Sequence, residues 1–151
     1  MLGVYIMNKM HIGFKGKNNA SGIVAKSISP NSYLLTNSFE GLKKDIESLD
    51  HTYDCVILFG IDKKLVDTVR IEKVAEKGTK EFSTINLESI SAQLDSVGIS
   101  NYLSDKPTYY LCNEAYWHLL RKFKGKAVLI HIPSIKNINE SFITRLKHVF
   151  M

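Results

Sequence analysis

Continuous apolar runs alternate along this chain with segments whose apolar residues recur every three or four positions. The two strongest runs are 54–60, which ends in Gly60, and 127–132, which is followed by Pro133. Uninterrupted apolar strands of this kind are typical of a parallel sheet that is covered on both faces. Further strands are predicted over 4–14, 32–35 and 101–103, with alternating apolar residues over 66–75 and room for an edge strand in the polar stretch 78–86.

Helical periodicity appears in five segments between these runs. In the clearest of them Phe39, Leu42 and Ile46 form one apolar stripe. Ser38 and Ser21 each precede a helical segment and are suited to cap its first turn. Helices are expected over 22–28, 39–49, 87–97, 113–123 and 139–150. Because helices and strands alternate, we predict the α/β class, with a three-layer α/β/α sandwich around a mostly parallel central sheet.

Length and composition restrict the class of protein further. A chain of 151 residues is suited to a single domain over 1–151 with one full core. No apolar run approaches the roughly 20 residues that cross a bilayer, and residues 1–10 predict a strand rather than a signal peptide. With only two cysteines, Cys55 and Cys112, we expect free thiols and a cytoplasmic location.

The net charge of +5 is spread over the chain, with its densest cluster at residues 121–126. A basic face that solvates the protein explains this distribution. A phosphate- or nucleic-acid-binding surface is the alternative, and it would show salt-dependent retention on DNA.

Several turn and loop segments are predicted to meet at one edge of the sheet. In open α/β sheets functional groups gather at the carboxyl ends of the strands. The segments expected at that edge are Gly13-Phe14, Gly60, 104–110 and Pro133. Cys112 follows the third of these closely.

Cys112 and His131 are the residues best suited to nucleophilic chemistry. Cys112 is predicted to open a helix, where free N–H groups and the helix dipole would lower the pKa of a thiol. His131 lies in an apolar strand and could accept the thiol proton. Glu72, set among apolar neighbours, is the carboxylate that could hold the imidazole in place. Each has a simpler interpretation, as a core cysteine like Cys55, a core histidine and a solvated charge.

Several short motifs, in order along the chain, resemble those of the pyroglutamyl peptidase I (pyrrolidone-carboxylate peptidase) family. They are Gly13-Phe14 with Asn19-Ala20-Ser21 (Gly-Phe and Asn-Pro-Ser in the family), Asn37-Ser38-Phe39-Glu40, the strand 53–60, Glu72-Lys73-Val74-Ala75 (Glu-Arg-Val-Ala), Tyr110-Leu111-Cys112-Asn113 and Ile130-His131-Ile132-Pro133.

The resemblance implies a cysteine peptidase, a hydrolase that removes an N-terminal pyroglutamyl residue from peptides. It implies a triad of Cys112, His131 and Glu72, an α/β sandwich, a cytoplasmic location, no cofactor or metal, and often a homo-oligomer. The expected partner is a peptide with a blocked N-terminus, not a membrane, and nucleic acid is disfavoured.

The chain departs from the family pattern around the substrate pocket and is shorter in three places. The family's Gln-Ala-Gly-Gly-Arg after Gly60 is replaced by Ile61-Asp62-Lys63-Lys64-Leu65, and the segment after the Glu72 motif is contracted. Of the pocket residues, Phe14, Tyr110 and Leu111 remain as substrate-binding residues. A non-catalytic descendant of the fold that binds a peptide or a partner is therefore the alternative to an enzyme.

Overall fold

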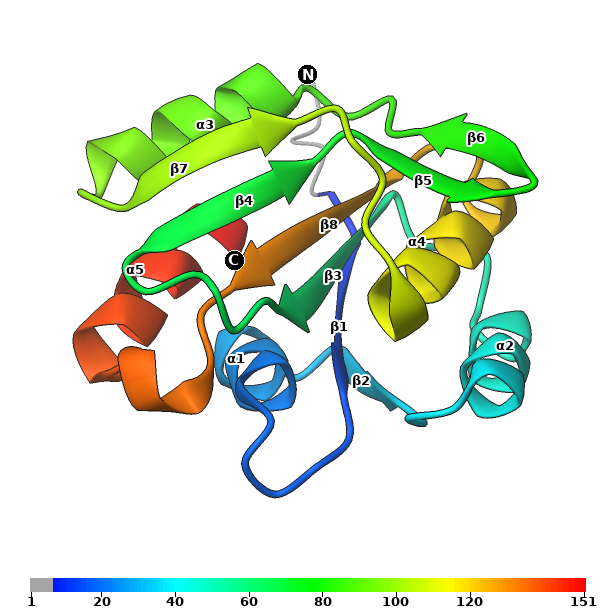
Figure 1. The fold of residues 1–151 in the computed structure, drawn as a ribbon, viewed down its shortest axis with the longest axis horizontal. Coiled ribbons are helices and arrows are strands. Elements are labelled where there is room, and N and C mark those ends of the chain that lie inside the picture. The colour runs from blue at the N-terminus through cyan, green and yellow to red at the C-terminus, as the bar shows by residue number, and fades with distance from the viewer. Residues whose placement is uncertain (1–6) are drawn as a thin grey trace, which may run out of the picture.

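The computed structural model describes residues 7–151, which form one six-stranded sheet, a separate two-stranded hairpin and five α-helices (Figure 1). The strands are β1 (Lys9–Phe14), β2 (Ser32–Leu35), β3 (Cys55–Ile61), β4 (Thr68–Glu72), β5 (Val74–Lys77), β6 (Thr79–Phe82), β7 (Ser100–Ser104) and β8 (Ala127–Ile132). The helices are α1 (Ala20–Ile28), α2 (Phe39–Glu47), α3 (Leu87–Ser96), α4 (Tyr110–Lys122) and α5 (Glu140–Phe150), with a short 3-10 turn at Ile135–Asn137. Of the strand predicted over 4–14, residues 4–6 lie outside the described residues.

The central sheet has the strand order β2-β1-β3-β8-β4-β7. All neighbouring strands are parallel except β8 and β4, which are antiparallel. The predicted α/β class with a mostly parallel sheet is therefore confirmed. Since β4 and β7 run against the other four strands, the prediction that Ser104 lies at the same edge as Gly60 and Pro133 is wrong. Alternating apolar positions show that a strand is half-buried but not in which direction it runs.

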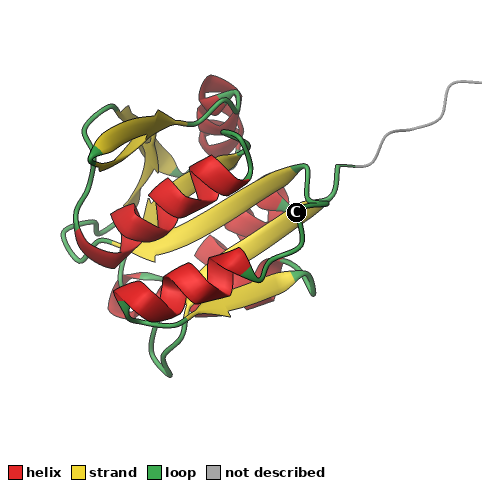
Figure 2. Ribbon diagram, turned by 90° about the vertical axis from the view of Figure 1, so that its right-hand side faces the viewer, coloured by secondary structure: helices red, strands yellow, loops and turns green. Residues whose placement is uncertain are grey.

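Alternation of side chains along the strands divides the core into two halves, and helices lie on both faces of the sheet (Figure 2). From β3, Cys55, Ile57 and Phe59 pack with helices α1, α3 and α5 on one face. Val56 and Leu58 pack with α2 and α4 on the other. This arrangement is the three-layer sandwich that the continuous apolar runs predicted.

Two helices begin two or more residues before their predicted starts. The N-cap of α1 is Asn19, whose side chain accepts a hydrogen bond from the Ser21 backbone N–H. Ser21 is instead buried inside the helix, and its hydroxyl accepts a hydrogen bond from the backbone N–H of Phe14 at 3.0 Å. Helix α4 begins at Tyr110, three residues before the predicted start, so Cys112 lies within its first turn.

The β5–β6 hairpin contacts α4 through polar groups. The indole N–H of Trp117 donates to the carbonyl of Thr79 at 3.1 Å, and Arg121 pairs with Glu81 at 3.1 Å. Closer to Cys112, the side-chain amide of Asn113 accepts from the backbone N–H of Glu76 and donates to its carbonyl. The hairpin thereby fixes the first turn of α4.

Candidate active site

On the face of the sheet toward α4, three residues lie side by side on neighbouring strands. Gly60 of β3 is paired with His131 of β8, and His131 is paired with Arg70 of β4. Glu72 lies two residues beyond Arg70 and, because side chains alternate along a strand, on the same face. Three strands that are far apart in the sequence thus place their polar side chains on one surface.

His131 and Glu72 form a buried pair. Nδ1 of His131 lies 2.9 Å from Oε1 of Glu72, and the two residues are 3% and 0% exposed. A carboxylate at Nδ1 orients an imidazole and stabilises its protonated form. The structure thus brings Glu72 and His131, two of the predicted site residues, into contact, and their catalytic role stays a prediction.

Gly60 brings Cys112 and His131 together. A Cβ atom built on Gly60 would lie 2.7 Å from Sγ of Cys112 and 3.3 Å from Nε2 of His131. Both atoms are therefore close to the same point, on the side of the ring opposite Glu72. The thiol, the imidazole and the carboxylate are arranged in the order that a nucleophile, a base and its orienting group require.

Contacts of α4 fix the position of Cys112. The buried hydroxyl of Tyr116 donates to the backbone carbonyl of Glu72 at 2.7 Å, which ties the helix to β4. Tyr110, the first helical residue, has a φ of 64°, in the left-handed region that a bulky residue rarely adopts. Such strain costs on the order of 1 kcal/mol or more and is found mainly at functional sites.

The resting thiol of Cys112 is not an activated one. Burial, together with the charges of Glu72 and Asp62, raises its pKa to about 11, against the opposing effects of a hydrogen bond from the Ile61 backbone and the charge of Arg70. The helix dipole, from which we expected a lowered pKa, is outweighed by desolvation. Cys112 is thus protonated at neutral pH.

We expect iodoacetamide to label Cys112 faster than Cys55 in the folded protein. Burial raises the pKa of both thiols to about 11, but Cys55 is buried in β3 whereas Cys112 is partly accessible. Because the thiolate is the nucleophile, the rate at Cys112 should rise about tenfold per pH unit from pH 7 to 10 and level off near pH 11. Mass spectrometry of quenched samples measures both sites. Equal labelling of the two residues, or a plateau near pH 8.5, would contradict the expectation.

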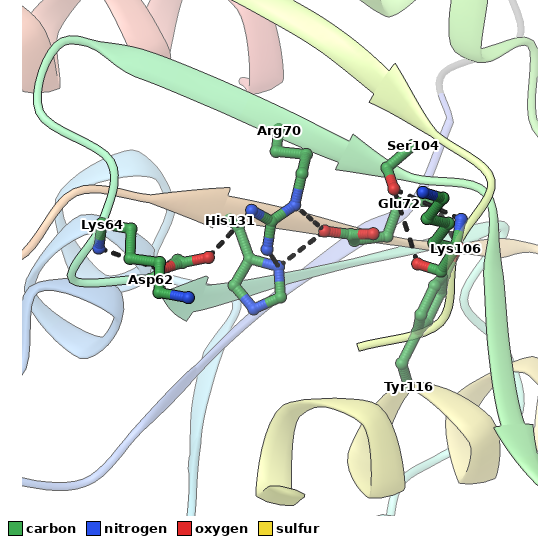
Figure 3. A network of polar contacts seen from close by, with 8 residues as sticks. All are labelled: Asp62, Lys64, Arg70, Glu72, Ser104, Lys106, Tyr116 and His131. Carbon is green, nitrogen blue, oxygen red and sulfur yellow. Dashed lines mark hydrogen bonds and ion pairs between the residues drawn. The ribbon is translucent and has the colours of Figure 1, made fainter. Parts of the chain in front are cut away.

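Arg70 and Asp62 are two residues of this site that the motifs did not identify (Figure 3). The guanidinium of Arg70 donates through Nε to Oε1 of Glu72 and through Nη1 to Oδ2 of Asp62 at 2.8 Å. Its Nη2 lies 3.3 Å from Nδ1 of His131. Against the opposing effect of burial, a hydrogen bond from the Lys64 backbone N–H and the pairing with Arg70 lower the pKa of Asp62. The sequence held one signal for Arg70. It lies two residues before Glu72, so on a strand the two side chains lie on the same face.

The three residues expected to bind substrate lie in different settings. Phe14 is 4% exposed within the apolar cluster on the α2 and α4 side of the sheet, and Leu111 packs against that cluster. Tyr110 is 84% exposed. The structure brings Phe14 and Leu111 to one cluster and leaves Tyr110 outside it, and their role in binding stays a prediction.

Within residues 7–151, no group of three or more His, Cys, Asp and Glu side chains is arranged to hold a metal ion. No helix in this range has the length and apolar character that crossing a membrane demands.

No protein-family model and no curated protein matches the chain in sequence. Solved structures do match its fold. Pyrrolidone carboxyl peptidase from Thermus thermophilus is 14% identical with a TM-score of 0.77, over 95% of this chain and 100% of that one. Pyroglutamyl peptidase I from Bacillus amyloliquefaciens is 15% identical with a TM-score of 0.76, over 96% and 95%. The pyrrolidone carboxyl peptidase from Thermococcus litoralis is 18% identical with a TM-score of 0.73, over 94% and 90%. The chain therefore has the fold of the pyrrolidone carboxyl peptidases.

Proposed function

We propose that the protein is a cysteine-type exopeptidase that removes an N-terminal pyroglutamyl or similar residue from peptides. The observation that carries this proposal is the meeting of Cys112 and His131 at Gly60, with Glu72 at 2.9 Å on the far side of the imidazole. The motif resemblance and the names of the similar structures supply the substrate class.

In this mechanism His131 takes the proton of Cys112 through Nε2 as Sγ attacks the carbonyl carbon of the N-terminal residue. The carbonyl oxygen becomes an oxyanion and accepts hydrogen bonds from backbone N–H groups at the start of α4. Among the described residues, Tyr109 at the N-cap supplies no side-chain hydrogen bond, which leaves these donors available.

Collapse of the tetrahedral intermediate breaks the C–N bond. His131 gives its proton to the leaving amine, and the acyl group remains on Sγ as a thioester. Water then attacks the thioester, with His131 as base, and frees the acid and the thiol. Glu72 holds the imidazole during these steps and stabilises its charged form.

The proposal includes a peptide with a blocked N-terminus as the substrate, a cytoplasmic location and self-association into a homo-oligomer. The proposed substrate-binding residues are Phe14, Leu111 and Tyr110.

Hydrolysis of a pyroglutamyl-coumarin amide tests the proposal. We expect release of the fluorophore by the unaltered protein, its loss in Cys112→Ser, and full activity in the matched variant Cys55→Ser. Release that persists in Cys112→Ser would exclude this residue as the nucleophile. No release from the pyroglutamyl amide, with release from a prolyl or glutamyl amide, would move the proposal to another N-terminal group. If no amide is cleaved, the chain is a binding protein built on this fold.

A further inference from the structure

Nδ1 of His131 contacts one hydrogen-bond acceptor and one hydrogen-bond donor (Figure 3). The carboxylate of Glu72, at 2.9 Å, only accepts hydrogen bonds, so that contact needs a proton on Nδ1. The guanidinium of Arg70, with Nη2 at 3.3 Å, only donates, so that contact needs a lone pair on Nδ1. One ring nitrogen cannot satisfy both at once.

Arg70 also competes with His131 for the carboxylate itself. Nε of Arg70 and Nδ1 of His131 both contact Oε1 of Glu72. The other oxygen, Oε2, is buried and has no hydrogen-bond partner in the described part of the chain. The positive charge of Arg70 thus offsets the negative charge that would stabilise a protonated imidazole.

Arg70 is held firmly in this place. Asp62, in the loop after β3, binds Nη1 at 2.8 Å, and a hydrogen bond with the Tyr102 side chain of β7 adds to the pairing with Glu72. Two further titratable groups face this cluster from α4, the thiol of Cys112 and the hydroxyl of Tyr116. The side chain of Arg70 is only 16% exposed.

We infer that Arg70 is a positioning residue that holds the resting His131 with its proton on Nε2. In this tautomer Nε2 faces Cys112 with a hydrogen rather than a lone pair, so it cannot accept the thiol proton. When Arg70 leaves Nδ1, the proton on Nε2 exchanges through water for one on Nδ1, where Glu72 accepts its hydrogen bond, and the lone pair on Nε2 becomes available. The inference rests on the Cys112–His131 pair of the proposed function.

Nitrogen-15 NMR of the histidine rings, with His131 assigned from the spectrum of His131→Gln, tests the inference directly. We expect the unaltered protein to carry the proton on Nε2 of His131 at pH 7.5. In Arg70→Met the proton should move to Nδ1. Arg145→Gln on α5 is the matched control and should leave the proton on Nε2.

Asp62→Asn keeps Arg70 and removes part of its neutralising charge, so we expect the Nε2-protonated form of His131 to persist. This variant and the unaltered protein keep the test decisive if Arg70→Met fails to fold. A resting proton on Nδ1 of His131, in either of them, would overturn the inference.

The NMR readout does not need peptidase activity. An inactive protein with the expected tautomer would remove the proposed function and leave the role of Arg70. An active protein with a proton on Nδ1 at rest would do the reverse.

Discussion

Replacing Glu72 with glutamine is expected to lower kcat/KM for a pyroglutamyl amide by about 10³- to 10⁴-fold while the fold persists. The side chain is buried and its Oε1 contacts Nδ1 of His131 at 2.9 Å. A neutral amide of the same shape no longer stabilises the imidazolium, and its NH₂ group can force the wrong tautomer on the ring. Steady-state kinetics and a thermal melt by circular dichroism measure the two quantities.

Glu88→Gln is the matched control, because this exposed carboxylate in the first turn of α3 is remote from the triad. It should leave kcat/KM unchanged. An unchanged rate in Glu72→Gln would remove Glu72 from the mechanism. A large loss of melting temperature together with the activity would instead assign it a structural role.

Gly60→Ala is expected to lower kcat/KM by about 10²-fold through a steric effect on the catalytic pair. The added methyl group would lie 2.7 Å from Sγ of Cys112, closer than carbon approaches such an atom in proteins, and 3.3 Å from Nε2 of His131. Cys112 or His131 must therefore shift by several tenths of an ångström, and displacements on the order of 1 Å cost about this factor. Gly60 does not have a positive φ, so the backbone accepts alanine.

Gly78→Ala serves as the comparison. Gly78 lies at the turn of the β5–β6 hairpin with a φ of +75° and open space around it, so alanine there strains the backbone by about 1 kcal/mol without reaching the site. We expect a lower melting temperature and unchanged kinetics. If Gly60→Ala keeps full activity and normal alkylation of Cys112, the absence of a side chain at Gly60 is not what allows Cys112 and His131 to approach each other.

The sequence predicted the elements of the fold better than their directions. The apolar runs that form β3 and β8 and the stripes that form α2 and α5 depend on local periodicity, which is visible in one dimension. The reversal of β4 and β7 depends on pairing between distant segments, and an alternating pattern is the same in either direction.

The same distinction applies to the site. Cys112, His131 and Glu72 were identified because their residue types and surrounding motifs are specific to a chemistry. The pKa of Cys112 could not be predicted, because the helix dipole acts locally whereas desolvation depends on which residues cover the thiol. Arg70 was missed because its partners Asp62 and His131 come from other elements.

The position of β8 in the sheet has a consequence for how the molecule is made. This strand is the last along the chain, yet it lies between β3 and β4 and joins the two halves of the sheet. During synthesis, segments emerge from the amino end first, so β3, β4 and the helix that carries Cys112 are all available before residues 127–132 can insert. Until residues 127–132 have been synthesised, Cys112 therefore lacks the neighbouring imidazole of His131, and a polypeptide truncated before β8 lacks the proposed catalytic pair.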